Sequence, residues 1–342
     1  MKEDKLIILS NEKVFREKKL DQYSCLNADL QILPDELNKF YNVECIFRKL
    51  KDKGNHKYNF KKIKASGNIF VFILNLLRTF KTKKSKYLII SISPYTFISF
   101  LFLFFFKKNI FTYLMSDGHE EYKYILGNWS VWIYDLMFKI LTKNSKVIVC
   151  HERLFDKDKS FLIDPSRLSE VWMSNHTIPK KDIPRLLYVG RINPEKGIEN
   201  FINIFNKLKI KAELSIVGES RKKNSFLNSK NIKLLGYVSQ ERNLVDIYDG
   251  HNITILPSYT EAYPYVIEES LSRRRPVIIF KDIDYVKKNK LGIFISKRDV
   301  DSVTKTINHI LENYYNIQKD IEKNKLPTKK DMIQRFVQIL NN

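Results

Sequence analysis

The sequence of 342 residues predicts an α/β protein built from two doubly wound domains. Short apolar runs typical of buried strands alternate with helical patterns, which is the arrangement of parallel sheets flanked by helices. The alternation stops near residue 175 and begins again near residue 185. The length also favours two domains, because one domain usually has about 100–200 residues.

The first half contains five strand-like runs and two clear helical runs. The predicted strands are residues 6–9, 43–47, 87–92, 110–114 and 146–150, and the predicted helices are 69–80 and 129–141. A linker with two prolines follows at 175–184. The first domain is therefore expected at 1–175.

The second half repeats this order and is expected to form a domain at 176–328. Its predicted strands are residues 185–189, 214–217, 232–235, 253–256 and 277–280. Between the first two, residues 198–208 place apolar side chains on one helical face. A final helix at 329–342 follows the break at Pro327 and could cross back to the first domain.

Charge is distributed unevenly along the chain. The formal net charge is +22, and residues 46–110 contain fifteen Lys or Arg but one acid, Asp52. A one-sided field of this kind attracts anionic partners, such as a membrane surface. The alternative is a composition rich in Lys throughout the chain, with no particular partner.

Residues 95–106 lie in this basic region and are apolar on every side. The run is shorter than the ~20 residues that span a bilayer. It therefore predicts a core helix between two strands, or alternatively a segment inserted into one leaflet with Lys107 and Lys108 at the headgroups.

The cysteines and the N-terminus suggest a cytoplasmic protein, with a peripheral position on the inner face of the plasma membrane as an extension. The three cysteines, Cys25, Cys45 and Cys150, are scattered and do not have metal-ligand spacing. The N-terminus has too short an apolar run for a signal peptide.

Two carboxylates, Glu261 and Glu269, are separated by seven residues after the predicted strand 253–256. The end of a strand and the start of the next helix form the usual nucleotide site of an open α/β sheet. Carboxylates there can accept hydrogen bonds from sugar hydroxyls. A general acid and base pair is the other chemistry that two such groups could serve.

A second motif follows the strand 185–189. Gly190 makes a turn, Asn193 suits a helix N-cap and Pro194 suits the first helical position. Helix N-termini bind phosphate, and Arg191 and Lys196 add two cations at this end. A solvated surface pair is the alternative reading of those cations.

Residues 186–280 resemble the nucleotide-sugar domain of the family 4 glycosyltransferases, which have the GT-B fold. The resemblance rests on the order and spacing of several motifs. They are Val189-Gly190-Arg191, Glu195-Lys196-Gly197, Val217-Gly218, Leu235-Gly236-Tyr237, Leu256-Pro257-Ser258, Glu261 with Glu269, and Pro276-Val277.

The resemblance implies a role for each matching residue. Arg191 and Lys196, next to Gly190, would hold the diphosphate of the sugar donor. Glu261 would accept hydrogen bonds from the sugar, and Glu269 from the ribose. The other implied contacts to the sugar donor are Gly236 and Tyr237 beside the base, and Ala262 and Tyr263 in the loop between the acids.

The first domain would hold the acceptor. Family members often have a histidine that faces the donor sugar, and His119 or Asp117 would fill that place. The alternative is an ordinary turn at Asp117-Gly118. The glycine-rich loop that usually follows the first strand is missing, so the acceptor is not identified.

Two stretches depart from the family pattern. Ala262 and Pro264 stand where glycines are usual, and proline lacks the N–H that could contact a ligand. Arg273 to Arg275 precede Pro276 where a small residue is usual, which puts the detailed shape of the phosphate site in doubt.

The expected function is transfer of a hexose-type sugar from a UDP- or GDP-sugar to a glycan or lipid-linked acceptor in bacterial surface polysaccharide synthesis. Retention of anomeric configuration and independence from metal ions are implied. The alternatives are a basic nucleic-acid-binding protein and a GT-B protein that binds a ligand without catalysis. Paired carboxylates disfavour the first of these, because they repel phosphate backbones.

Overall fold

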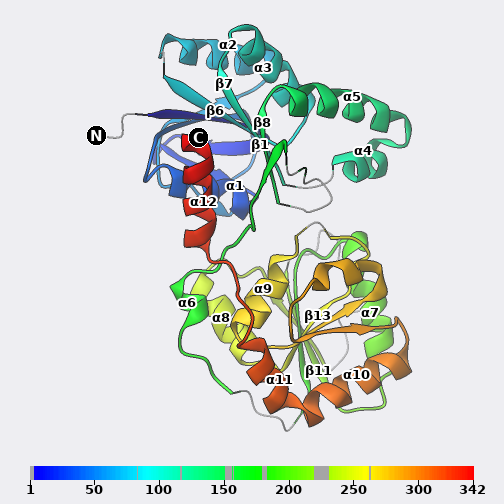
Figure 1. Ribbon diagram of the computed structural model, residues 1–342. Helices are drawn as coiled ribbons and strands as arrows, with labels where there is room; N and C mark the ends of the chain where they lie inside the picture. The colour runs from blue at the N-terminus through cyan, green and yellow to red at the C-terminus, as the bar shows by residue number, and fades with distance from the viewer. Residues whose placement is uncertain are drawn as a thin grey trace. The chain divides into compact units, whose positions relative to one another are not determined.

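A computed structural model describes residues 4–82, 84–115, 118–150, 156, 158–178, 183–218, 231–261 and 263–342. The chain divides into two compact units: Met1–Pro165 with Lys330–Asn342, and Ser166–Lys329 (Figure 1). The division falls before the boundary expected at residue 175. The reason is the short helix α6 (Glu170–Met173), where Trp172 packs on Tyr248 of the second unit with ring centroids 5.4 Å apart.

The described residues of the first unit form a nine-stranded sheet in which β3 pairs with β1 and β5, and the remaining order is β4-β2-β1-β6-β7-β8-β9. Its strands are β1 (Lys5–Glu17), β2 (Gln22–Cys25), β3 (Asn42–Lys49), β4 (His56–Lys57), β5 (Ile63–Ser66), β6 (Ser85–Ile90), β7 (Asn109–Leu114), β8 (Lys146–Val149) and β9 (Ser160–Leu162). The pairings of β2 with β1 and β4 are antiparallel, and the other pairings are parallel. The five predicted strands correspond to β1, β3, β6, β7 and β8.

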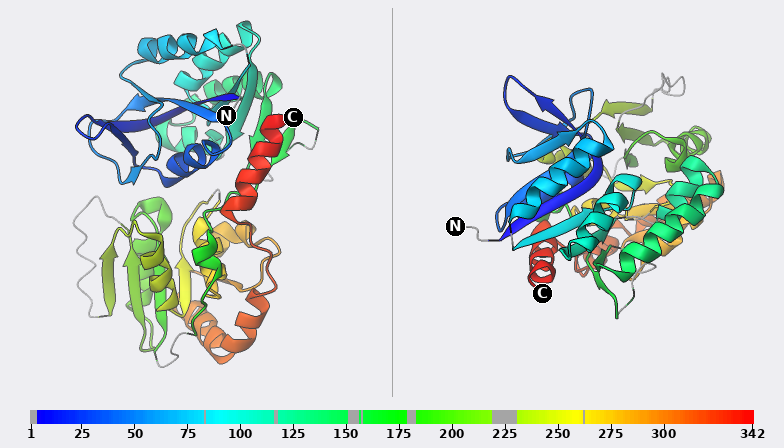
Figure 2. Two further views of the ribbon diagram at one scale, coloured as in Figure 1. Left: turned by 90° about the vertical axis from the view of Figure 1, so that its left-hand side faces the viewer. Right: turned by 90° about the horizontal axis from the view of Figure 1, so that it is seen from above.

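Two helical layers cover this sheet. One face packs on α1 (Ala28–Leu37) and α12 (Lys329–Asn341). The opposite face packs on α2 (Ile69–Arg78), α3 (Pro94–Phe105) and α5 (Trp129–Lys143), with α4 (Gly118–Leu126) beside α5. The final helix α12 (red in Figures 1 and 2) thus completes the core of the first unit.

The apolar segment 95–106 forms most of α3, between β6 and β7. Ser93 caps the helix, with Pro94 at its first position, and Phe100 and Leu103 are fully buried against the sheet. The segment is therefore a core helix, as one of the two readings predicts, although its C-terminal end is exposed. Among the described residues, no helix is both long and apolar enough to cross a bilayer.

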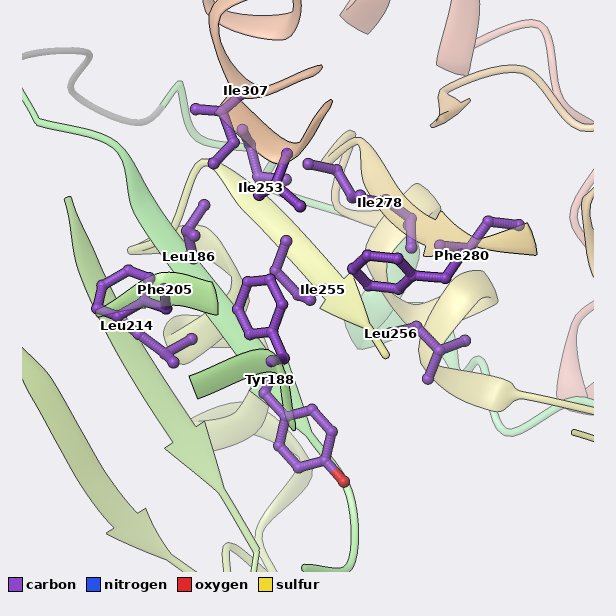
Figure 3. Packing of buried hydrophobic residues seen from close by; sticks show 14 of the residues in the cluster. Leu186, Tyr188, Phe205, Leu214, Ile253, Ile255, Leu256, Ile278, Phe280 and Ile307 are labelled. Atoms are coloured by element: carbon purple, nitrogen blue, oxygen red, sulfur yellow. The ribbon is translucent and has the colours of Figure 1, made fainter. Parts of the chain in front are cut away.

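The second unit forms a parallel six-stranded sheet in its described residues, in the order β12-β11-β10-β13-β14-β15. The strands are β10 (Arg185–Val189), β11 (Glu213–Val217), β12 (Ile232–Gly236), β13 (Ile253–Leu256), β14 (Val277–Phe280) and β15 (Ile293–Ser296), and the helices besides α6 are α7 (Ile198–Phe205), α8 (Glu241–Asp249), α9 (Tyr265–Ser272), α10 (Val300–Glu312) and α11 (Tyr314–Ile321). Apolar side chains of the central strands interlock with those of α7 and α10, which gives a rigid base for the loops at the strand ends (Figure 3).

Candidate active site

Two loops meet at the carboxyl edge of the second sheet. The first follows β10, and the second follows its neighbour β13. The Tyr259 N–H donates to the Glu195 carbonyl at 3.0 Å. Gly197 has a φ of 64°, and a Cβ there would lie 2.1 Å from the Pro257 carbonyl oxygen. Only glycine allows this approach, so the two sequence motifs form one structural unit.

The first loop is not the α-helix start that the sequence predicts. Pro194 begins a 3₁₀ turn, η3 (Pro194–Lys196), and the α-helix α7 begins at Ile198. Asn193 has the extended conformation of a cap, but its side chain accepts no capping bond from the backbone, and its amide N–H donates to Glu195 Oε1 at 2.9 Å. The tight turn lets Lys196 project toward the second loop.

Lys196 and Glu261 form an ion pair at the junction of the two loops. Lys196 Nζ lies 2.6 Å from Glu261 Oε1, and the Ser258 hydroxyl donates to the same oxygen at 2.6 Å. The side chains are 20% and 8% exposed, so the pair is largely shielded from water. The implied phosphate-binding cation and sugar-binding acid therefore lie within direct reach of each other.

The backbone of Glu261 is held by a tyrosine from a different loop. Tyr285, in the 3₁₀ segment η5 (Lys281–Lys287), accepts from the Glu261 N–H at 3.1 Å and donates to its carbonyl at 2.6 Å. These two bonds fix the loop where Pro264 removes one backbone donor. Sequence reasoning included Ser258 in a family motif without assigning it a role, and it missed Tyr285.

Arg191 is placed differently from Lys196. Its side chain is exposed and makes no ion pair with any residue in the described part of the chain. Its carbonyl accepts a 2.6 Å hydrogen bond from the Tyr188 hydroxyl. Burial raises the pKa of Tyr188, with a further contribution from the charges of Glu261 and Glu195. The backbone of Arg191 is thus fixed while its guanidinium is available to an anion.

Arg298 supports the second loop from outside. Its guanidinium donates to the Pro257 and Ser258 carbonyls at 2.9 and 2.8 Å. It also pairs with Asp282 at 2.8 Å and lies 4.2 Å from the ring centroid of Tyr259. The Asp282-Ile283-Asp284 sequence, which has the spacing of a metal motif, therefore supplies a structural ion pair.

The two adjacent glutamates of α9 have separate partners. Glu269 is 5% exposed and accepts a 2.9 Å bond from the hydroxyl of Tyr248, whose pKa burial raises strongly. Glu268 is buried, pairs with Lys290 and accepts from the Tyr263 hydroxyl at 3.1 Å. Tyr263 thus orders the loop through Glu268.

Three glycines lie at the ends of β10, β11 and β12. The Gly190 N–H donates to the Val217 carbonyl and the Gly218 N–H to the Gly236 carbonyl, both at 2.9 Å. A Cβ on Gly218 would lie 1.9 Å from the Gly190 carbonyl oxygen. Gly236 has a φ of 72° with open space beside it, and Tyr237 is 39% exposed. At Gly218 the approach of the Gly190 carbonyl thus excludes a side chain, whereas at Gly236 the positive φ favours glycine.

Of the remaining predicted site residues, Asp117 and Ala262 lie outside the described residues. His119 belongs to the first unit, where its Nε2 lies 3.6 Å from Asp135 Oδ1 and its ring meets Tyr134 edge-on.

Comparisons with known proteins bear on the family and the fold. Residues 170–326 match the family model described as "Glycosyl transferases group 1". Residues 170–326 therefore form a domain of the group 1 glycosyl transferases. HepE from Anabaena, solved in complex with UDP, aligns with a TM-score of 0.72 at 11% identity over 98% of this chain and 99% of that chain. The fold is GT-B, with two Rossmann-like domains.

Two curated relatives are similar to this chain in sequence. An uncharacterised 41.2 kDa protein in the cps region of Klebsiella pneumoniae is 22% identical over 83% of this chain and 79% of its own length. The N,N'-diacetylbacillosaminyl-diphospho-undecaprenol alpha-1,3-N-acetylgalactosaminyltransferase of Campylobacter jejuni is 23% identical over 68% of this chain and 65% of its own length.

The arginines before Pro276 have a structural role in this glycosyltransferase domain. Arg273 and Arg275 are 1% and 0% exposed. Arg273 pairs with Asp249 at 2.6 Å and donates to the carbonyls of Trp172, Ser174 and Asn175. Arg275 donates to the carbonyls of Tyr248, Asp249 and Thr177. They anchor residues 172–177, so this departure from the family pattern does not involve the Lys196–Glu261 junction.

Proposed function

We propose that this glycosyltransferase uses a nucleoside-diphosphate sugar, either a UDP- or a GDP-hexose. The observation that carries the proposal is the 2.6 Å contact between Lys196 Nζ and Glu261 Oε1. In a sugar donor the hexose is bonded directly to the β-phosphate. A cation for that phosphate and an acid for that hexose must therefore lie only a few Å apart, as these two groups do.

The sugar donor would take over the interactions of the ion pair. Lys196 would turn from Glu261 to the diphosphate, and Arg191 would add a bidentate contact. Glu261, still bound to Ser258, would accept hydrogen bonds from the hexose hydroxyls. Glu269 would accept from the ribose, and the open edge at Gly236 and Tyr237 would receive the base.

We propose transfer with retention of configuration. The acceptor oxygen bonds to the anomeric carbon as the bond from that carbon to the β-phosphate oxygen breaks, and the acceptor proton passes to the departing phosphate on the same face. Glu261 is supported as a hydrogen-bond acceptor rather than as a base, because Lys196 Nζ and the Ser258 hydroxyl both donate to its Oε1.

The cations of the site would stabilise the leaving diphosphate without a metal ion. Arg191 and Lys196 would be placed where negative charge develops, which is the role that a divalent cation serves in other transferases. Turnover should therefore continue at an undiminished rate in excess EDTA. Loss of turnover in EDTA with recovery in Mg²⁺ or Mn²⁺ would refute this part.

We propose a glycan or lipid-linked acceptor in bacterial surface polysaccharide synthesis. The Campylobacter relative's name specifies a diphospho-undecaprenol acceptor, and the Klebsiella relative is encoded in a cps region. His119 or Asp117 would contribute from the first unit. We also propose a peripheral position at the inner face of the plasma membrane.

The experiment is turnover of a panel of UDP-, GDP- and ADP-hexoses with undecaprenyl-diphosphate-linked acceptors, followed by NMR of the product. We expect one sugar donor to be consumed and the product to keep its anomeric configuration. An inverted product would refute retention. Binding of a nucleotide sugar without turnover of any acceptor would favour a catalytically silent protein.

A further inference from the structure

The basic segment 46–110 separates into two parts with different surroundings. In the first part, three lysines pair with acids: Lys53 with Glu17 at 2.8 Å, Lys61 with Asp21 at 3.6 Å, and Lys64 with Glu44 at 2.5 Å. In the second part, Lys86 pairs with Asp4 at 2.8 Å, whereas Lys81, Lys84, Lys107 and Lys108 have no ion pair with any acid in the described ranges. The sequence from 53 to 116 contains no Asp or Glu at all. Excess positive charge therefore remains on the second part.

The same part of the first unit exposes large apolar side chains. On α3 and just after it, Phe104, Phe105 and Phe106 are 45%, 76% and 57% exposed. On the adjacent α2, Phe70 and Leu74 are 77% and 53% exposed. These helices cover the same face of the sheet, and the view from above shows them side by side (Figure 2, right).

The apolar and basic side chains converge at one corner. The rings of Phe80 and Phe106 lie 5.0 Å apart, which joins the end of α2 and its 3₁₀ extension η1 (Thr79–Lys81) to the end of α3. Lys108 Nζ lies 4.7 Å from the Phe80 ring centroid. Lys107 ends α3 in the left-handed region, with a φ of 48°. Exposed phenylalanines and unpaired lysines therefore occupy the same turn.

We propose that this corner, formed by residues 80–82, 84 and 104–108, docks the protein on an anionic lipid bilayer. Phe105 and Phe106 would enter the boundary between headgroups and acyl chains, while Lys81, Lys84, Lys107 and Lys108 would contact anionic headgroups. Both features are needed, because a single weak signal gives only marginal membrane binding.

The distribution of charge and apolar side chains favours a lipid bilayer over a second copy of the chain or a nucleic acid. A second copy of the chain would place lysines against lysines. A nucleic acid would satisfy the lysines but would leave the apolar strip of α2 and α3 in water. The surface belongs wholly to the first unit, so the proposal does not depend on the sugar-donor chemistry of the second.

Co-sedimentation of the full chain with vesicles tests the proposal. Vesicles of phosphatidylcholine with phosphatidylglycerol should bind the protein at least tenfold better than phosphatidylcholine alone, and 0.5 M NaCl should weaken that binding. Phe105→Ser with Phe106→Ser, and separately Lys107→Gln with Lys108→Gln, should each reduce binding at least tenfold. The matched control is Tyr315→Ser with Lys319→Gln, an exposed aromatic and lysine pair on α11 whose Nζ lies 4.5 Å from the ring centroid.

The lysine double variant removes charge and leaves Phe105 and Phe106 in place, so it guards against a failure of the phenylalanine variant to fold. Unchanged binding in the lysine variant would overturn the proposal. Equal binding to neutral and anionic vesicles would also overturn it, as would binding to RNA but not to vesicles. Nucleotide-sugar binding should be the same in all these variants, which separates this test from that of the proposed function.

Discussion

Lys196 Nζ and Glu261 Oε1 lie 2.6 Å apart, although 65 positions separate the two residues in the sequence. The contact neutralises the two groups that the sugar donor would need. It also gives a counter-charge to an acid that is only 8% exposed. Binding of a sugar diphosphate would exchange this pair for two new interactions, one with each part of the ligand.

Loss of either partner should abolish most transfer. We expect Lys196→Ala and Glu261→Ala each to lower kcat/KM by about 100-fold or more, as removal of a group that stabilises developing charge usually does. Lys207→Ala and Glu199→Ala are matched controls, because both residues are exposed on or just after α7. Steady-state kinetics and thermal melts of the four variants check this. Full activity in either site variant would refute the assignment.

Gly197 should not tolerate a side chain. Alanine there would strain a left-handed backbone by about 1–3 kcal/mol and would collide with the Pro257 carbonyl. We expect Gly197→Ala to lower the melting temperature and to weaken nucleotide-sugar binding by opening the loop junction. Gly67→Ala is the control, since a Cβ at that position meets nothing within 4 Å. Equal behaviour of the two variants would contradict the junction.

The buried arginine cluster should dominate the stability of the second unit. Asp249→Ala would leave Arg273 without its buried counter-charge, and we expect unfolding to become easier by about 3–5 kcal/mol in urea titrations. Arg274→Ala breaks only an exposed pair with Glu322, and we expect a change within about 1 kcal/mol. A change of similar size in both variants would show that the cluster is not the anchor of residues 172–177.

Stability should fall as the pH drops below about 6.5. Burial lowers the pKa of His251 and of His176 from their usual values, and hydrogen bonds to the Ile247 and Ser272 carbonyls only partly oppose it. As the pH falls, these histidines therefore bind protons in the unfolded chain before they do so in the folded protein. Their contribution to the free energy of unfolding is complete above the pKa of the unfolded chain and is lost as the pH falls through the pKa of the folded protein. Urea titrations should show that the free energy of unfolding falls less between pH 7.5 and pH 5.5 in His251→Gln than in His309→Gln. His309 is exposed, so this second variant is the control. Identical losses would refute this.

Much of the fold follows from local sequence pattern. The strands β10, β13 and β14 have the predicted bounds, because short apolar runs between turn residues are typical of a buried parallel sheet. The pattern fails at β1, which continues to Glu17 through the polar residues Ser10 to Lys13 and pairs back with β2. That hairpin depends on pairing between strands, which residue periodicity does not encode.

The site residues could be predicted only where a motif lies within one continuous segment of the sequence. Lys196 and Glu261 follow from motif spacing, but their direct contact depends on how two loops cross. Tyr285 and Arg298 come from later loops and have no motif of their own. The sequence placed Arg273 and Arg275 near the phosphate site. It does not show that backbone carbonyls of residues 172–177 accept hydrogen bonds from these buried side chains.

Two ligands separate the roles of the central pair most directly. Isothermal titration should compare the nucleoside diphosphate with its sugar conjugate in the wild type, Lys196→Ala and Glu261→Ala. We predict that Lys196→Ala weakens binding of both ligands at least tenfold. Glu261→Ala should weaken only the sugar conjugate, because it removes the hexose contact and frees Lys196 for the phosphate. The account would be contradicted if Glu261→Ala weakened binding of both ligands equally. It would also be contradicted if Lys196→Ala weakened binding of neither ligand.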